Sequence, residues 1–191
     1  MAFPPRLIEE YESLIRGIVE RIAHKQKPNT CISDCLTCDS STLQECDVNA
    51  RGKYPVYGAN GIVGYLDNYN TDGEAIYIIK DGSGVGGVCH VVGKCSATGT
   101  LNILQAKGGY SLLYVYYMLK AFRFEPYKTG MAIPHIYFKD YRKAKIYCPP
   151  YVQQVRFAQI WSAIDRKIQV ERDVLALLCN QKQYLLRKMF I

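Results

Sequence analysis

The chain has 191 residues and a formal net charge of +7, and 49% of its residues are hydrophobic while 21% are charged. This composition is typical of a folded protein and excludes a chain that is disordered throughout. The longest apolar stretch, residues 112–119, is shorter than the ~20 residues that cross a bilayer, so no membrane span is expected.

The N-terminal segment predicts an amphipathic helix over residues 3–25. Its apolar residues recur at spacings of three and four, which is the period of one helical face. Pro4 and Pro5 suit a helix start, and Pro28 follows its end. The segment has acidic residues and prolines where a secretory signal needs a basic start and an apolar run. We therefore assign residues 1–27 to this helix and expect a cytoplasmic location.

Four of the eight cysteines lie in the next segment, at Cys31, Cys35, Cys38 and Cys46. The first three have a spacing that suits a four-iron cluster, but such a loop follows a strand of a parallel barrel, and here it follows a helix. Zinc is a second alternative, although no Cys-x2-Cys pair is matched by another at finger-like distance. Reduced thiols that pack as small apolar residues are favoured, so neither a metal nor a cofactor is expected.

Residues 28–149 predict an irregular β-rich domain. Short β-branched and aromatic runs alternate with turn residues, and one helix is expected at residues 111–123. With the flanking helices, this pattern indicates an α+β fold. The expected strands are residues 54–57, 62–66, 75–80, 87–92, 101–105 and 144–147.

The signals for catalysis in this domain are weak. A dinucleotide-binding loop must open a helix, whereas the glycine-rich residues 82–87 lead into another strand and indicate a hairpin. His24, His90 and His135 have no nucleophile and acid at a supporting spacing. The Asn-Pro-Pro-Tyr or Asp-Pro-Pro-Tyr box of amino-methyltransferases is absent from the sequence. The chain therefore does not look like the catalytic half of a DNA-modifying enzyme.

Basic and aromatic residues are interleaved near the end of this domain. Residues 107–145 contain eight lysines and arginines together with tyrosines, and residues 139–191 carry the whole net charge of +7. Lysine and arginine contact phosphates, while Asn, Ser, Thr and His read base edges. Double-stranded DNA is one partner that this pattern suits, and ordinary solvated charge is the alternative interpretation.

The C-terminal segment, residues 150–191, predicts one long helix. After Pro149 and Pro150 the sequence contains neither Pro nor Gly. A helix of this length spans ~60 Å, which is too long for burial in so small a globule. Apolar residues follow alternating steps of three and four, which is the pattern of a coiled-coil seam. The N-terminal helix is expected to cover part of that seam, and a second copy of the long helix is expected to cover the rest.

Four blocks in this order resemble the DNA-specificity subunit of type I restriction-modification systems. They begin GKYPVYGANG at residue 52, AIYIIKDGSG at 75, YKTGMAIPHI at 127 and QQVRFAQIWS at 153. In that family each half consists of a target-recognition domain followed by a long spacer helix, and a full subunit contains two halves. The resemblance covers residues 52–190 and implies a half-subunit with one recognition domain.

The resemblance implies a non-catalytic role in sequence-specific recognition of a bipartite, palindromic DNA site by a homodimer. Its expected partners are the DNA adenine methyltransferase subunit and the ATP-dependent restriction subunit. The expected dimerisation seam is Trp161, Ile164, Ile168, Leu175, Leu178 and Leu185. The expected DNA-reading residues are Tyr57, Asn60, Lys80, Ser83, Lys94, Thr98, Lys128, Thr129 and His135. Core packing is an equally good interpretation of Tyr57 and Tyr127. The alternative function is an oligomerisation or inhibitory module that binds methyltransferase or full-length specificity subunits without reading DNA.

Overall fold

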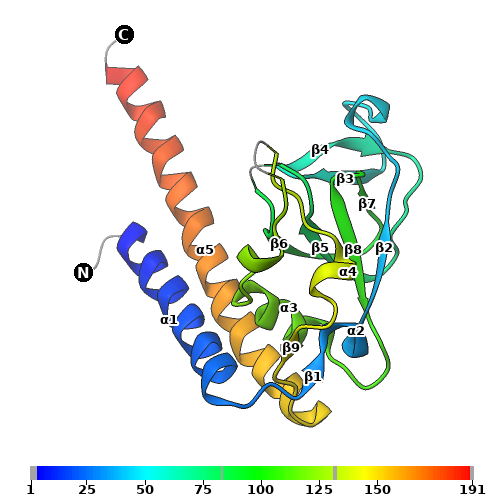
Figure 1. Cartoon of the computed structure of the whole chain (residues 1–191). Coiled ribbons are helices and arrows are strands. Elements are labelled where there is room, and N and C mark those ends of the chain that lie inside the picture. Colours follow the sequence, from blue (N-terminus) through cyan, green and yellow to red (C-terminus); the bar gives the residue numbers. More distant parts are fainter. Residues whose placement is uncertain (1–3, 83, 131–132, 190–191) are drawn as a thin grey trace.

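The structure is a computed structural model that describes residues 4–82, 84–130 and 133–189. A β-rich domain lies beside two long helices, α1 (Pro4–Lys25) and α5 (Tyr151–Met189), which run in opposite directions (Figure 1). We call these two helices the helix pair. The α+β class, the N-terminal helix and the long C-terminal helix are confirmed. Within the described residues, no helix is long and apolar enough to cross a membrane.

The helix pair is held together by the apolar face that the sequence predicts for α1. Ile8, Ile15 and Val19 are buried in the same core as Ile168 of α5. An ion pair between Glu12 and Arg172 joins the two helices at their surface. Because the buried residues of α1 follow the helical period, one face of this helix covers α5 while the other remains in solvent.

The β-rich domain contains three small sheets. The largest has the order β2-β8-β5-β6, with every neighbouring pair antiparallel. A second has the order β4-β3-β7, in which β3 and β7 are parallel, and the third pairs β1 with β9. The strands are β1 (Thr30–Cys31), β2 (Leu36–Ser40), β3 (Tyr54–Gly58), β4 (Gly61–Leu66), β5 (Glu74–Ile79), β6 (Val88–Val92), β7 (Ser96–Ala97), β8 (Leu101–Ala106) and β9 (Lys145–Ile146).

Each of the six expected strands is present with slightly different ends, and the glycine-rich segment joins the antiparallel strands β5 and β6 as the expected hairpin. The expected central helix is the shorter α3 (Leu112–Lys120), which ends three residues earlier than expected; the Ser111 side chain accepts a hydrogen bond from the Tyr114 backbone and caps its start. The sequence analysis missed β1, β2 and β7. It also missed the short helices α2 (Ile32–Cys35), α4 (Phe138–Tyr141), η1 (Glu45–Asp47) and η2 (Glu125–Tyr127).

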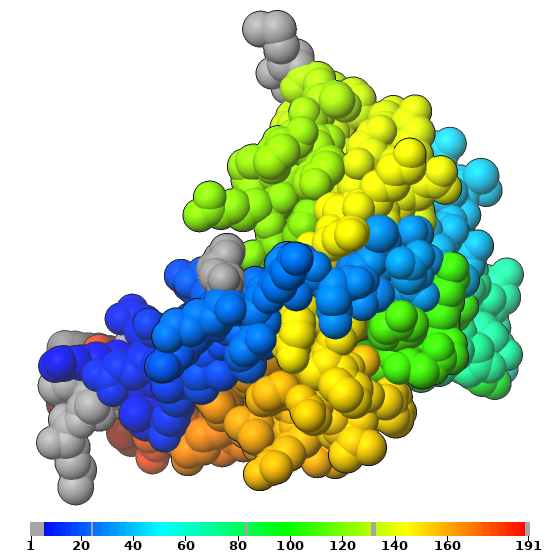
Figure 2. Space-filling model, turned by 60° about the horizontal axis from the view of Figure 1, so that its bottom comes forward, coloured from blue at the N-terminus to red at the C-terminus, as the bar shows by residue number. Residues whose placement is uncertain are grey.

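The β-rich domain is fixed to the helix pair through α3 and through the two segments that connect them. Tyr114 and Tyr117 of α3 lie against Trp161 of α5, with ring centroids 5.6 and 5.2 Å from the indole. The segment after α1 lies beside the segment before α5, where β1 pairs with β9 (Figure 2). Aromatic packing and paired connections therefore set the position of the domain on the helices.

Candidate nucleic-acid interface

The loop after β5 and the loop before α4 meet at one edge of the β-rich domain. The carbonyl of Lys80 accepts a hydrogen bond from the backbone of Ile136 at 2.9 Å. Thr129 and His135 exchange two backbone hydrogen bonds, at 2.9 and 2.8 Å. These bonds bring together four of the expected DNA-reading residues from two distant parts of the sequence. We call this group, Lys80, Lys128, Thr129 and His135, the loop surface.

A glycine fixes the tight turn in the second of these loops. Gly130 has a φ of +87°, and a Cβ there would lie 2.3 Å from the carbonyl oxygen of Ile133 and 3.0 Å from Nδ1 of His135. Only glycine adopts this backbone conformation without a clash at such a close approach. The imidazole of His135 also packs edge-on against Tyr137, with ring centroids 5.1 Å apart. The position of His135 is therefore set by the turn.

Lys128 is half-buried and is paired with a carboxylate of its own loop. Its Nζ lies 3.0 Å from Oε1 of Glu125, and this hydrogen bond lowers the pKa of Glu125. A pair that is open to solvent on the carboxylate side contributes little to stability because water competes for both charges. The lysine can therefore exchange its carboxylate partner for a phosphate at small cost.

The structure places Tyr57 and Thr98 next to each other but gives them packing roles. The Thr98 backbone donates to the carbonyl of Tyr57 at 2.9 Å. The Thr98 side chain is only 1% exposed and shares a hydrogen bond with the Thr100 hydroxyl, so the expected contact of this side chain with DNA is wrong. Tyr57 is half-buried, its ring lies edge-on against Tyr77 at 5.8 Å, and burial raises its pKa. Packing inside the domain therefore accounts for much of the position and burial of Tyr57.

Two further expected contacts are Asn60 and Ser83. Asn60 is exposed in the turn between β3 and β4, where its amide is accessible to a ligand. Ser83 lies outside the described residues. Asn60 therefore stays a predicted DNA contact on the ground of exposure, and Ser83 stays a prediction from sequence.

Lys94 lies away from the loop surface. The neighbouring Gly93 backbone donates to the Gly73 carbonyl at 2.8 Å, which places Lys94 near the start of β5, whereas the loop surface follows its end. The Lys94 ammonium lies 4.8 Å from the ring centre of Tyr69, which in turn packs edge-on against Tyr54. Sequence reasoning missed Tyr69, although an aromatic residue in an Asn-rich turn was the available signal. Lys94 and Tyr69 form a second exposed basic and aromatic group.

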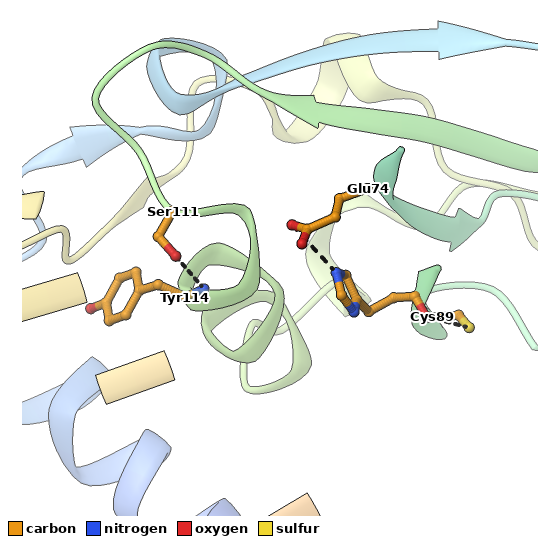
Figure 3. Close-up of polar contacts among 5 residues, drawn as sticks. Glu74, Cys89, Ser111 and Tyr114 are labelled. Carbon is orange, nitrogen blue, oxygen red and sulfur yellow. Dashed lines mark hydrogen bonds and ion pairs between the residues drawn. The ribbon is translucent and has the colours of Figure 1, made fainter. Parts of the chain in front are cut away.

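A histidine and a carboxylate lie near each other on the face of the sheet that meets α3, and a cysteine precedes the histidine in the strand, but the three do not form a catalytic relay (Figure 3). His90 Nε2 is 3.9 Å from Glu74, and burial lowers the pKa of His90. Cys89 donates to the backbone carbonyl of His90 at 3.7 Å, and Figure 3 shows its sulfur directed away from the imidazole. Consecutive strand residues face opposite sides of a sheet, so Cys89 and His90 cannot act as nucleophile and base.

The cysteines of the segment after α1 are dispersed by the strand that follows them. Cys35 is buried in α2, Cys38 pairs with Leu104 across β2 and β8, and Cys46 is exposed in η1. Because β2 is extended, it separates the cysteines that the sequence spaces closely. Within the part of the chain that the structure describes, no three His, Cys, Asp or Glu side chains are grouped to hold a metal ion.

The expected dimerisation seam on α5 divides into two halves. Trp161 and Ile168 are 0% and 4% exposed, because α1 and α3 of the same chain cover them, so their assignment to a dimer interface is wrong. Ile164 and Leu175 are half-buried against the same core. Leu178 and Leu185, by contrast, are 50% and 51% exposed, and they remain available to a second molecule.

The family model of the type I restriction modification DNA specificity domain matches residues 34–179. The chain is 28% identical over 112 residues to the type I restriction enzyme EcoprrI specificity subunit of Escherichia coli, which covers 59% of this chain and 28% of that protein. It is 26% identical over 120 residues to the putative type I restriction enzyme specificity subunit S.HindORF215P of Haemophilus influenzae, which covers 61% and 31%.

Solved structures of two specificity subunits have a fold similar to that of this chain. The S subunit of a type I restriction-modification system from M. genitalium superposes with a TM-score of 0.79 at 19% identity, covering 97% of this chain and 55% of that one. The HsdS subunit from Thermoanaerobacter tengcongensis gives 0.62 at 15% identity, covering 97% and 52%. The chain thus spans about half the length of these subunits and less than a third of the curated relatives.

Proposed function

The chain belongs to the type I restriction modification DNA specificity domain family, as its resemblance predicted, and we propose that it is a DNA-recognition half-subunit. In this proposal residues 28–149 are the target-recognition domain, and residues 150–191 are the spacer and dimerisation helix. In this proposal the subunit recognises a DNA sequence, and partner subunits catalyse the reactions on the DNA.

The observation that carries the proposal is a single β-rich domain fixed near one end of a helix that extends beyond it (Figure 1). Only the first half of α5 has residues buried by the rest of the chain, the last being Ile168. A helix of 39 residues is ~60 Å long, so its exposed part extends many ångströms from the domain. A helix that holds a reading domain at one end serves as a spacer between two such domains.

Two copies are needed because one β-rich domain reads one half-site. A two-fold axis across the exposed half of α5 would pair Leu178 and Leu185 of one copy with the same helix of the second, antiparallel copy. Both domains would then present identical surfaces, so the DNA site would be palindromic and in two parts. The helix length would set the unread gap between them.

The loop surface supports DNA reading by its chemistry. Lysine ammonium groups at Lys80 and Lys128 suit phosphate oxygens, while the hydroxyl of Thr129 and the imidazole of His135 suit base edges. Lys94 lies at the other end of β5, roughly 20 Å away for a strand of six residues. We assign Lys94 to the phosphate backbone outside the bases that the loop surface reads.

The proposed partners follow from the family. The homodimer would bind two copies of a DNA adenine methyltransferase subunit and position them over adenines within the bipartite site. The assembly would also recruit the ATP-dependent restriction subunits. Neither a metal nor a cofactor is assigned to this chain, since S-adenosylmethionine and ATP would be bound by its partners.

The test is to co-express the chain with the DNA adenine methyltransferase encoded beside it and to map methylated adenines across the host genome. We expect methylation at one bipartite palindromic motif. The matched control replaces Thr129 and His135 with alanine, which should abolish or relax the motif while the complex still assembles. A complex that survives nuclease treatment but shows no sequence-selective methylation would instead favour the oligomerisation or inhibitory module.

A further inference from the structure

One exposed side chain beside the loop surface is aliphatic. Ile133 lies two residues before His135 and is 68% exposed, whereas the members of the loop surface are basic or polar. Burial of an isoleucine is favourable because it removes apolar area from water, and here most of that area stays in contact with water. The side chain of Ile133 is therefore available to an apolar group outside the chain.

Backbone contacts on both sides fix the position of Ile133. The paired backbones of Thr129 and His135 close its loop, and the Gly82 backbone donates to the carbonyl of Pro134 at 3.1 Å. A proline disfavours helical backbone in the residue before it, and a side chain branched at Cβ has few rotamers. Ile133 therefore has little conformational freedom to lose when it binds a ligand.

The ligand that suits this side chain follows from the groups that duplex DNA exposes. Phosphates, sugars and most base edges are polar, and the apolar group in the major groove is the C5 methyl of thymine. This methyl also distinguishes a T·A pair from the other pairs. An aliphatic side chain among phosphate-binding and base-reading groups is thus matched to thymine.

We propose that Ile133 is a specificity-determining residue that contacts the C5 methyl of one thymine in the half-site. The inference rests on the proposed function, because it requires the loop surface to face the major groove. Lys80 and Lys128 would position the loop on the phosphates, while Ile133 would select thymine at one position. The contact adds an apolar element to a reading surface that is otherwise polar.

A second aliphatic side chain provides a matched control. Val92 at the end of β6 is 69% exposed and is also branched at Cβ, but it pairs with Glu74 at the start of β5. It therefore lies at the opposite end of β5 from the loop surface, next to the segment of Lys94 that we assign to the phosphate backbone. Because phosphates carry no methyl group, Val92 should not distinguish thymine from a base that lacks this methyl.

The experiment uses the complex with the methyltransferase and a duplex that contains the mapped motif. Each thymine position is replaced in turn, in both half-sites, by deoxyuridine, which keeps the pairing with adenine and lacks only the C5 methyl. Fluorescence anisotropy measures the affinity. We expect the affinity to fall at one thymine position, by about four-fold for each half-site, which is the loss for one methyl group that is no longer buried.

Three variants assign this discrimination to a side chain. Ile133→Ala should bind the thymine duplex more weakly and bind the thymine and deoxyuridine duplexes equally. Ile133→Val keeps a branched aliphatic side chain and should retain most of the discrimination. Val92→Ala should discriminate as the parent does. Gel filtration of each complex verifies assembly, and circular dichroism verifies the fold.

The outcomes separate this inference from the proposed function. Equal affinity for all of the duplexes in the parent, or undiminished discrimination in Ile133→Ala, would overturn the role of Ile133 while a methylated motif still supported DNA recognition. A complex that fails to assemble in Ile133→Ala would assign the side chain to a subunit contact and would also overturn it. The absence of any methylated motif would reject the proposed function, and this inference with it.

Discussion

At the scale of single residues, Trp161 shows how a residue expected at an interface between molecules instead holds one molecule together. Its indole stacks on Phe157 with centroids 5.6 Å apart and meets Tyr114 and Tyr117 of α3. The large apolar side chain therefore joins the helix pair to the β-rich domain. Helical spacing identified Trp161 as an inward-facing position of α5, but spacing alone does not say which element covers that position.

Replacing Trp161 with alanine should be strongly destabilising. The substitution leaves a cavity among aromatic rings, and a change of this kind lowers the free energy of unfolding by about 3–5 kcal/mol. Urea denaturation at low protein concentration measures this loss. Leu185→Ala is the control, because its side chain is 51% exposed and should cost less than about 0.5 kcal/mol in the monomer. Equal losses in the two variants would contradict the burial of Trp161 within one chain.

Lys128 is the residue at which DNA binding is tested most directly. Lys128→Ala should weaken DNA binding and reduce the slope of log affinity against log salt by about 0.9, the value for one lost phosphate contact. Glu125→Gln should have the opposite effect on affinity, because it frees Lys128 from its carboxylate partner. Fluorescence anisotropy over a salt series measures both slopes.

A matched lysine on the other side of the domain separates a phosphate contact from a general loss of charge. Lys107 donates to the carbonyl of Ser33, near the junction with the helix pair, so Lys107→Ala should leave the salt slope unchanged. Lys94→Ala should reduce the slope as Lys128→Ala does if both groups contact one duplex. An unaltered slope in the Lys128 variant would remove the loop surface from the DNA interface.

At the scale of elements, periodicity predicted the parts of the fold whose pattern is local. The two long helices and the six strands that were expected each carry their own alternation or helical repeat. The missed strands β1 and β7 are two residues long, so they have no period to detect, and β7 depends on parallel pairing with β3. β2 was missed because Cys38 within it and the cysteines around it indicate a metal site, although the segment pairs with β8. Non-local pairing cannot be read from spacing.

For the candidate site too, the sequence predicted local properties of residues but not their contacts with distant parts of the chain. Lys80 and Lys128 were both expected to contact DNA, and the structure places these half-buried residues in two loops that meet. Thr98 has the residue type of a base-reading side chain, yet its hydroxyl is used by Thr100 inside the domain. Residue type predicts what a side chain is able to bond, whereas its actual partner depends on how the loops pack.

The exposed half of α5 makes a prediction about assembly. The double variant Leu178→Glu with Leu185→Glu should convert the proposed homodimer into a monomer, because four like charges would meet in an apolar seam of the paired helices. Light scattering at tens of micromolar measures the mass. The control is Asn180→Glu, which lies about 200° around the helix from Leu178 and should leave the dimer intact. A parent protein that is already monomeric at this concentration would refute the dimer.

At the scale of the whole molecule, the connections explain why the β-rich domain and the helix pair behave as one body. The aromatic cluster of α3 and α5 lies between them, while Asn29 and the β1–β9 pair tie together the two connecting segments. If the β-rich domain could rotate freely on α5, the length of this helix would not determine the separation between two such domains. In the proposed function, this rigid mounting would allow the length of α5 to set a distance along DNA.

This relation gives the most demanding prediction for the assembled complex. Seven residues inserted after Gln181 of α5 add two helical turns, which preserve the seam and lengthen the helix by about 10.5 Å at 1.5 Å per residue. Because B-DNA rises 3.4 Å per base pair, the unread gap of the methylated motif should grow by about three base pairs while both half-sites stay the same. Methylation mapping of the variant with its methyltransferase measures the gap. Inserting two residues instead rotates the seam by about 200° and should abolish methylation, and an unchanged gap in the seven-residue variant would show that α5 does not set the spacing.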